Sequence, residues 1–218
     1  MRVLVINPNT TGTMTAMVTQ RLRLRMEAGT QFRQMTAATG HAVIATRQAF
    51  DEAGPTGQGM LKDAMTGGEA FDAVLLACFG DPGLEAMQAF ASVPVTGLAQ
   101  ASMRYAEVQD MPWAIVTAGP AWKDILEQRL APWGASALFK GVHVLAGSGA
   151  AVLQDPVGML PVVAAAIEQA RRAGAINVVL GGAVFAGWRD LMSQHGLATD
   201  CVIDCVDAAA AAMTAATS

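Results

Sequence analysis

The sequence predicts an α/β protein made of two pseudo-symmetric lobes, each a mostly parallel sheet flanked by helices, with the active site between them. Three observations support this fold class. Short apolar runs alternate with helix-length segments along the 218 residues. Two of these runs are repeated, with the segments that follow them, about half a chain later. Hydrophobic residues make up 53% of the chain and charged residues 15%, so apolar surface suffices for a core in each lobe.

The apolar runs have the continuous character of strands buried on both faces, which parallel sheets covered by helices require. We expect strands at residues 3–6, 74–77, 93–97, 114–116, 142–145, 178–180 and 202–203. Helical segments lie between them, at residues 13–26, 55–66, 84–90, 122–130, 157–173 and 189–195. The Ala-rich end of the chain suits a further packed helix.

The internal repeat relates the two halves of the chain. VLLACFGDPGLEAMQ begins at Val74 and VVLGGAVFAGWRDLM at Val178, so Cys78 and Gly182 correspond at an offset of 104 residues. VLVINPNT near the start resembles AIVTAGPA from Ala114 at an offset of about 110 residues.

Each lobe then takes its strands from one half of the chain. We expect residues 1–98 with residues 205–218 to form the first lobe, and residues 99–204 to form the second. Corresponding strand ends would face each other across one cleft, and ligands of such sheets bind outside the carboxyl ends of the strands.

Charge and composition argue against several function classes. The net charge of −4 comes without a basic run, so nucleic acid is not an expected partner. The most apolar tract, residues 160–167, is far shorter than a membrane span. Three scattered cysteines do not suggest a disulfide framework, and the chain opens into a strand without a signal-peptide pattern. We expect a cytoplasmic protein with reduced thiols and no membrane partner.

The first polar loop, residues 7–13, follows the opening strand and leads into a helix. Its short side chains, among them those of Asn9 and Thr10, and its backbone N–H groups can cradle an anion at the helix N-terminus, which makes this loop a candidate binding segment. Capping of the helix by Thr11 or Thr13 explains the same residues, and the two interpretations are compatible.

The second loop begins at Cys78, where a strand ends. Asp81 and Pro82 resemble the N-cap and first residue of the next helix, which would place Cys78 near the positive end of a helix dipole. That position lowers a thiol pKa toward neutrality and makes the thiol a competent proton donor and acceptor. The alternative is a buried cysteine that packs as a small apolar residue.

Two loops of the second half complete the candidate cleft. Thr117 closes a strand and either donates a hydrogen bond into the cleft or caps the helix that begins near residue 122. Residues 181–187 correspond to the Cys78 loop and offer backbone N–H groups but no titratable side chain.

The sequence contains no motif for metal binding or nucleotide binding. His41, His143 and His195 lie in unrelated segments, so no metal site is expected. Cys201 and Cys205 have no paired ligands and are expected to pack in the last strand and helix. Neither a Walker loop nor a GxGxxG loop is present, which leaves nucleotide binding without support.

Taken together, these segments resemble the Asp/Glu/hydantoin racemase family. The resemblance spans nearly the whole chain in order, and it rests on four motifs: INPNTTGTMT at residues 6–15, LACFGDPGLEA at 76–86, PVTGLAQASM at 94–103 and VVLGGAVFAG at 178–187. The first two motifs are specific, and the last departs from the family pattern.

The resemblance implies a mechanism as well as a fold. Family members need no pyridoxal phosphate or metal, and one cysteine from each lobe flanks the α-carbon of the substrate. Cys78 matches the first of these cysteines, and Asn9 matches a position that binds the carboxylate or ring carbonyl. The backbone amides of Phe79 and Gly80, with Thr117, would line the same cleft, and Ala183 would add an amide from the other lobe.

The departure falls on the second cysteine. Residues 180–183 read Leu-Gly-Gly-Ala, so Gly182 stands where an acid is expected, and glycine cannot carry a proton. Water or another side chain could serve the open face. A single thiol also suffices for decarboxylation, where loss of CO2 makes the carbanion, although arylmalonate-decarboxylating relatives carry their one cysteine in the second lobe. An engineered or degenerate site is the third explanation.

The sequence therefore predicts a cofactor-independent isomerase that moves a proton at the α-carbon of a hydantoin or an amino-acid derivative, with Cys78 as acid/base. A single-cysteine decarboxylase is the alternative. A binding protein that has lost its chemistry and a thiol hydrolase are further candidates, the last without a visible histidine partner. A homo-oligomer is expected from the resemblance.

Overall fold

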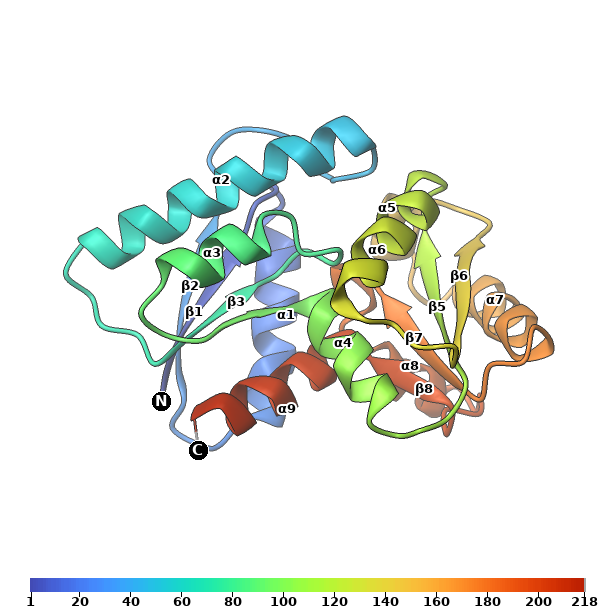
Figure 1. Ribbon diagram of the computed structural model, residues 1–218. Coiled ribbons are helices and arrows are strands. Elements are labelled where there is room, and N and C mark those ends of the chain that lie inside the picture. Colours follow the sequence, from blue (N-terminus) through green and yellow to red (C-terminus); the bar gives the residue numbers. More distant parts are fainter. Residues whose placement is uncertain (218) are drawn as a thin grey trace.

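Two four-stranded parallel sheets stand side by side in the computed structural model, which describes residues 1–217 (Figure 1). Their strand orders are equivalent, β2-β1-β3-β4 and β6-β5-β7-β8, so the internal repeat is a repeat of topology and the predicted fold class is confirmed. The first sheet consists of β1 (Arg2–Asn7), β2 (Gln31–Thr36), β3 (Ala73–Leu76) and β4 (Val95–Gly97). The second consists of β5 (Trp113–Ala118), β6 (Phe139–Leu145), β7 (Asn177–Gly181) and β8 (Val202–Asp204).

The inner strands are the apolar runs of the sequence. Every residue of β3, β5 and β7 is buried, as expected for strands covered by helices on both faces. All seven predicted strands form. The sequence pattern does not single out β2, because this edge strand is polar (QFRQMT), pairs with β1 alone and leaves three of its residues exposed.

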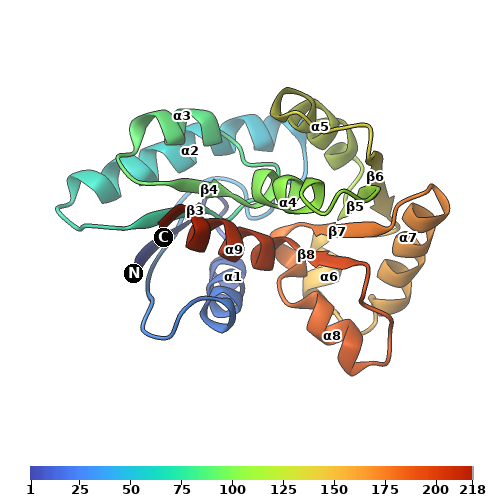
Figure 2. The same cartoon turned by 60° about the horizontal axis from the view of Figure 1, so that its bottom comes forward.

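Helices cover both faces of each sheet (Figures 1 and 2). They are α1 (Gly12–Arg25), α2 (Arg47–Thr66), α3 (Leu84–Phe90), α4 (Leu98–Glu107), α5 (Ala121–Leu130), α6 (Gly149–Gln154), α7 (Leu160–Arg172), α8 (Trp188–Gln194) and α9 (Cys205–Thr217), with 3₁₀ turns η1 (Ala131–Trp133) and η2 (Ala183–Phe185).

The main error in the helix predictions concerns α2. A start at Pro55 was expected, but the helix begins at Arg47 and contains Pro55 in its interior. The side chain of Thr46 accepts a hydrogen bond from the backbone N–H of Ala49, so Thr46 caps the helix one residue before its start. The sequence pattern does not single out α4 and α6 as helices.

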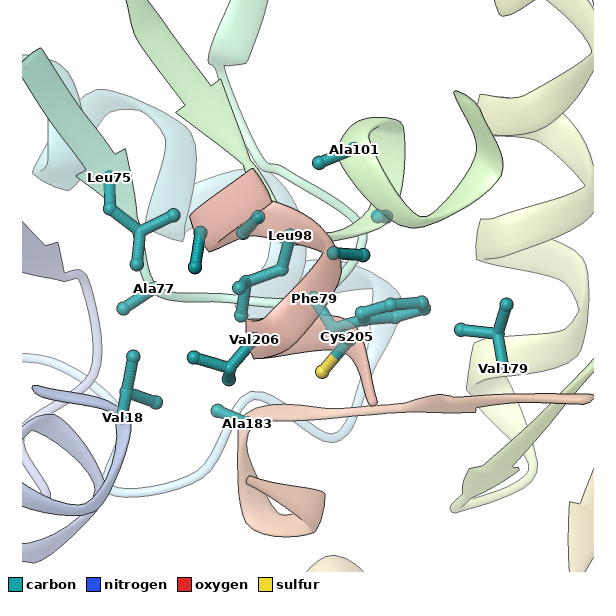
Figure 3. Packing of buried hydrophobic residues seen from close by; sticks show 14 of the residues in the cluster. Val18, Leu75, Ala77, Phe79, Leu98, Ala101, Val179, Ala183, Cys205 and Val206 are labelled. Atoms are coloured by element: carbon teal, nitrogen blue, oxygen red, sulfur yellow. The ribbon is translucent and has the colours of Figure 1, made fainter. Parts of the chain in front are cut away.

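One apolar cluster joins the two lobes. It contains residues of β1 and β3, of β5 and β7, and of helices α4 and α9, which pack against each other between the sheets (Figure 2). In Figure 3, Phe79 of the first lobe lies between the start of α9 and Val179 of β7. The lobes therefore share buried surface directly beneath the cleft.

A buried ion network also crosses between the lobes. The side chain of Arg21 on α1 is 3% exposed, and its guanidinium binds Asp207 of α9 at 2.5 Å and pairs with Asp190 of α8. Asp204, at the end of β8, lies 3.7 Å from the Arg21 Nε. Among residues 1–217, no helix has the length and apolar character needed to cross a bilayer.

Candidate active site

A cavity of about 280 Å³ opens between the carboxyl ends of the two sheets. One loop after each inner strand contributes to its wall: Asn9 follows β1, Cys78 follows β3, Gly119 follows β5 and Gly182 follows β7. Because the two sheets share one topology, the four loops come from pseudo-equivalent positions. This is where ligands bind to open parallel sheets.

Cys78 lies in the wall of this cavity with 6% of its surface exposed. It also belongs to an apolar cluster with Phe50 of α2 and Ile125 of α5. Its Sγ lies 3.8 Å from the carbonyl oxygen of Phe79, a weak contact that leaves the thiol available to a ligand.

The protonation state of this thiol differs from the sequence expectation. Burial raises the pKa of Cys78 well above its usual range, and the nearby charge of Asp81 raises it further. The expected helix dipole does not offset these effects, because α3 begins only at Leu84, with Gly83 as its N-cap. The expectation of a lowered pKa was wrong, because burial favours the protonated thiol.

Asp81 does not have the predicted role of a helix N-cap residue for α3. Its side chain does not cap α3; its carboxylate accepts hydrogen bonds from the backbone N–H groups of Ala99 at 3.0 Å and Gln100 at 2.7 Å, at the start of α4. A side chain at Gly97 would overlap this carboxylate, so glycine is required there. Burial raises the pKa of Asp81 to about 7, although the two N–H groups and Arg129 oppose the shift.

Asn9 presents an amide donor toward the cavity. Its Oδ1 accepts hydrogen bonds from the side chain of Asn7 and the backbone N–H of Thr11, both at 2.9 Å, and these bonds orient the side-chain amide. Among residues 1–217, the Nδ2 has a single hydrogen-bond contact, with the sulfur of Met14 at 3.5 Å. A thioether is a weak acceptor, so a ligand carbonyl or carboxylate would be a better partner for this N–H.

Of the other expected binding residues of the first lobe, some line the cavity and others do not. Phe79 lines the cavity, whereas Thr10 and Gly80 are not among its lining residues. The backbone N–H of Thr10 donates to the carbonyl of His41 at 3.0 Å. Within residues 1–217, the backbone N–H groups of Phe79 and Gly80 donate no hydrogen bond.

Thr117 lines the cavity without capping a helix. Its hydroxyl donates to the carbonyl of Gly181 at 2.7 Å, which joins the ends of β5 and β7, and the N-cap position of α5 is occupied by Pro120. The hydroxyl oxygen keeps its lone pairs, so Thr117 can accept from a ligand but has no further proton to donate.

The second lobe contributes Gly182 and Ala183 to the cavity wall. Gly182 has φ +153°, and a Cβ placed there would lie 3.3 Å from the ring of Phe185 and 3.5 Å from Val184. Behind Gly182, the thiol of Cys205 contacts the Gly182 carbonyl oxygen at 3.5 Å. Cys205 is fully buried and is not among the residues that line the cavity.

Several wall residues carry no signal in the sequence. Met14 of α1, Trp122 of α5, residues 43–45 and residues 147–150 all line the cavity. The last two segments are topological equivalents, since each connects an edge strand to the next helix. Only the repeat could have pointed to them, because neither segment contains a recognisable motif.

Titratable groups are sparse around the site. No Lys, Arg, His, Asp or Glu is among the residues that line the cavity. Throughout residues 1–217, no three His, Cys, Asp or Glu side chains come together in a way that could hold a metal ion. Cys201 and Cys205 pack against the apolar clusters, as expected.

Comparison with known proteins assigns this architecture. The profile of the Asp/Glu/Hydantoin racemase family matches residues 3–213. The hydantoin racemase of Paenarthrobacter aurescens is 31% identical over 214 residues, which cover 96% of this chain and 88% of that protein.

Solved structures of other proteins show the same fold. The allantoin racemase of Pseudomonas fluorescens superimposes with a TM-score of 0.88 at 25% identity, covering 99% of this chain and 90% of the other. A double mutant of arylmalonate decarboxylase shares the fold, with a TM-score of 0.68 at 14% identity over 99% of this chain and 92% of its own. The chain belongs to the Asp/Glu/Hydantoin racemase family.

Proposed function

We propose that this protein catalyses proton transfer at the α-carbon of a small carbon acid without a cofactor, and that Cys78 is the acid/base. One observation carries the proposal: the Cys78 thiol and the under-used Nδ2 donor of Asn9 belong to the wall of one cavity. A thiol moves the proton, and an N–H donor meets the charge that develops on the neighbouring oxygen.

The chemistry can be written on these groups. After the Cys78 thiol has released its proton to water, the thiolate takes the α-proton, so the C–H bond breaks, an S–H bond forms and the electron pair moves to the adjacent carbonyl oxygen. Asn9 and the N–H groups of Phe79 and Ala183, which donate no hydrogen bond within residues 1–217, would stabilise that oxyanion. Loss of one such donor typically costs about 3 kcal/mol of barrier.

The uncharged wall favours a neutral substrate. A free amino acid would bring an ammonium and a carboxylate into a site without a charged side chain, and unpaired buried charges are costly. A hydantoin ring carries its α-proton between carbonyl and N–H groups with no net charge. Within the proposed class, a hydantoin therefore fits this cavity better than a free amino acid.

The face opposite Cys78 determines the outcome of each turnover. Gly182 provides no acid, so a proton returned by Cys78 restores the starting enantiomer, and inversion depends on water entering over Gly182. Exchange of the α-hydrogen with solvent should therefore be faster than racemisation.

Decarboxylation is the second candidate, and two observations favour it. The high pKa of Cys78 keeps the thiol in the proton-donating form, and Gly182 leaves one face without a partner. In that reaction the C–C bond to the carboxylate breaks, CO2 leaves and the thiol protonates the carbanion from one side.

Incubation in heavy water separates the two reactions. With one enantiomer of a 5-substituted hydantoin, we expect deuterium at the α-carbon by NMR and a slower fall in optical rotation without loss of mass. Release of CO2 from an aryl malonate, with deuterium on one face of the product, would replace the first candidate by the second. Binding of both compounds without exchange or CO2 release would contradict both.

A further inference from the structure

We propose that Arg129, on helix α5 of the second lobe, is a positioning residue that holds the Cys78 loop (residues 78–83) in its working orientation. The proposal rests on the proposed function of Cys78. It assigns a role in the reaction to a residue that does not line the cavity.

Arg129 binds the backbone of the loop directly. Its Nε donates to the carbonyl of Gly80 and its Nη2 to the carbonyl of Asp81, both at 3.2 Å. These carbonyls belong to the second and third residues after Cys78. The guanidinium therefore links the backbone next to the thiol to a helix of the other lobe.

The loop needs such support because its backbone is strained. Gly80 has φ +92° and Asp81 has φ +56°, and a non-glycine residue is disfavoured in the left-handed region. Such conformations persist only where surrounding contacts hold them. The Asp81 carboxylate supplies one contact, on α4, and Arg129 supplies the other from α5.

Neighbouring side chains hold the guanidinium in place. Glu85 of α3 accepts from the Arg129 Nη2 at 2.7 Å and 2.9 Å, and the indole of Trp133 donates to the same carboxylate at 2.9 Å. The Arg129 Cζ lies 4.6 Å from the centre of the Trp133 ring. A planar fork can serve two carbonyls and a carboxylate at once, whereas a lysine ammonium is a single point donor.

A second contact of α5 with the loop lies beside the cavity. A Cβ at Gly80 would lie 2.7 Å from the ring of Trp122, which itself lines the cavity. Helix α5 thus contacts the loop through Trp122 at the cavity and through Arg129 behind it. Any separation of the lobes that moves α5 away from the loop must break both Arg129 bonds.

Turnover and thiol accessibility test the proposal. Arg129→Gln should lower kcat by about 10- to 100-fold, because a small displacement of the acid is costly, while KM stays within about twofold. Arg129→Lys should recover only part of the loss. Glu85→Gln should lower kcat much less than Arg129→Gln does, since the hydrogen bonds from Arg129 to the Gly80 and Asp81 carbonyls remain. The matched control is Arg172→Gln on α7, whose arginine forms an exposed ion pair with Glu168 and should leave kcat unchanged.

Alkylation of Cys78 by iodoacetamide, followed by peptide mass spectrometry, gives a readout that needs no turnover. Arg129→Gln should raise the Cys78 rate about tenfold as the loop opens more often, with the Cys201 rate unchanged as the internal reference. Thermal denaturation checks that each variant folds. If Arg129→Gln does not fold, the alkylation rate is measured in Arg129→Lys instead.

The outcomes separate the two proposals. Unchanged Cys78 alkylation and unchanged kcat in folded Arg129 variants would overturn the role of Arg129. A kcat loss in Glu85→Gln as large as in Arg129→Gln would also overturn it, because the surface ion pair would then suffice. Faster alkylation in a protein that neither exchanges nor decarboxylates any carbon acid would support the loop contact and refute the proposed function instead.

Discussion

The two lobes share one topology and differ at the residue where chemistry is expected. After β3 the first lobe places a thiol in the cavity wall, and after β7 the second lobe places Gly182, with backbone that disfavours a side chain. Symmetry of the fold therefore does not require symmetry of the reaction. The lobes keep matching walls of backbone and apolar side chains, while the proposed function assigns the acid/base to one side alone.

Each lobe also contains a buried carboxylate, after the third strand in the first lobe and on the fourth strand in the second. Asp81 lies in the loop after β3 and reaches the N-terminus of α4. Asp204 lies at the end of β8 and reaches back to the loop after β7, where it accepts from the Gly187 N–H at 2.6 Å, and forward to Val206 at the start of α9. In both sheets, a carboxylate joins the loop after the third strand to the helix that follows the fourth strand.

Removal of the thiol should produce the largest effect. Cys78→Ala is expected to lower the rate of α-hydrogen exchange by about 10² to 10⁴-fold, the usual contribution of a general acid/base. The matched control is Cys201→Ala, a half-buried cysteine outside the cavity, which should leave the rate unchanged. Full exchange in a folded Cys78→Ala variant would show that the lobes do not differ in the proposed way.

Removal of the charge that joins the lobes should have the next largest effect. Arg21→Met leaves the buried Asp204 without its cation and should lower the free energy of unfolding by about 3–5 kcal/mol in urea titrations. Arg25→Met, which removes a half-exposed arginine that also pairs with Asp190 and Asp207, should cost about 1 kcal/mol or less. Equal losses in both variants would argue that burial of the network does not matter.

Restoration of the symmetric arrangement is a third test. Gly182→Cys adds an acid on the open face and should create or raise racemisation relative to exchange. Because the backbone has φ +153°, we also expect a stability loss of about 1–3 kcal/mol. Gly182→Ala adds the same strain without a thiol and is the control. No gain in folded Gly182→Cys across several hydantoins and amino acids would count against the facing-lobe geometry.

The buried carboxylates should give a smaller, pH-dependent effect. Burial raises the pKa of Asp81 to about 7 and of Asp204 to about 6, so the folded protein binds protons that the unfolded chain releases near pH 4. The free energy of unfolding should therefore fall as the pH rises through this interval.

The Asn variants isolate each contribution. The stability difference between wild type and Asp81→Asn should decline between about pH 4 and pH 7, and that for Asp204→Asn should level off near pH 6. Measurement by urea denaturation across this range checks both. A difference that grows with pH would mean that the hydrogen bonds to the ionised carboxylates dominate over burial.

The sequence predicts the inner strands well because burial on both faces demands continuous apolar runs. It does not reveal β2, whose polar edge needs only one partner, nor the start of α2, where Thr46 rather than Pro55 sets the helix. The repeat indicates which loops face each other, because topology repeats with it.

The errors at the candidate site share one cause. The local pattern suggests that Asp81 caps α3 and that the Cys78 pKa is lowered, yet both depend on neighbours distant in the sequence, namely α4 and the apolar cluster around the thiol. Arg129 likewise acts across the lobes and leaves no local signature. The lobe boundaries, the cytoplasmic location and a homo-oligomer remain predictions.

Separate exchange measurements on the two enantiomers of one 5-substituted hydantoin test the one-sided acid/base most directly. In heavy water, with a protein-free control, we predict rapid incorporation of α-deuterium with retention for the enantiomer whose α-hydrogen faces Cys78, and much slower reaction of its mirror image. Equal exchange of both enantiomers, or one-sided exchange that survives Cys78→Ala, would contradict the account.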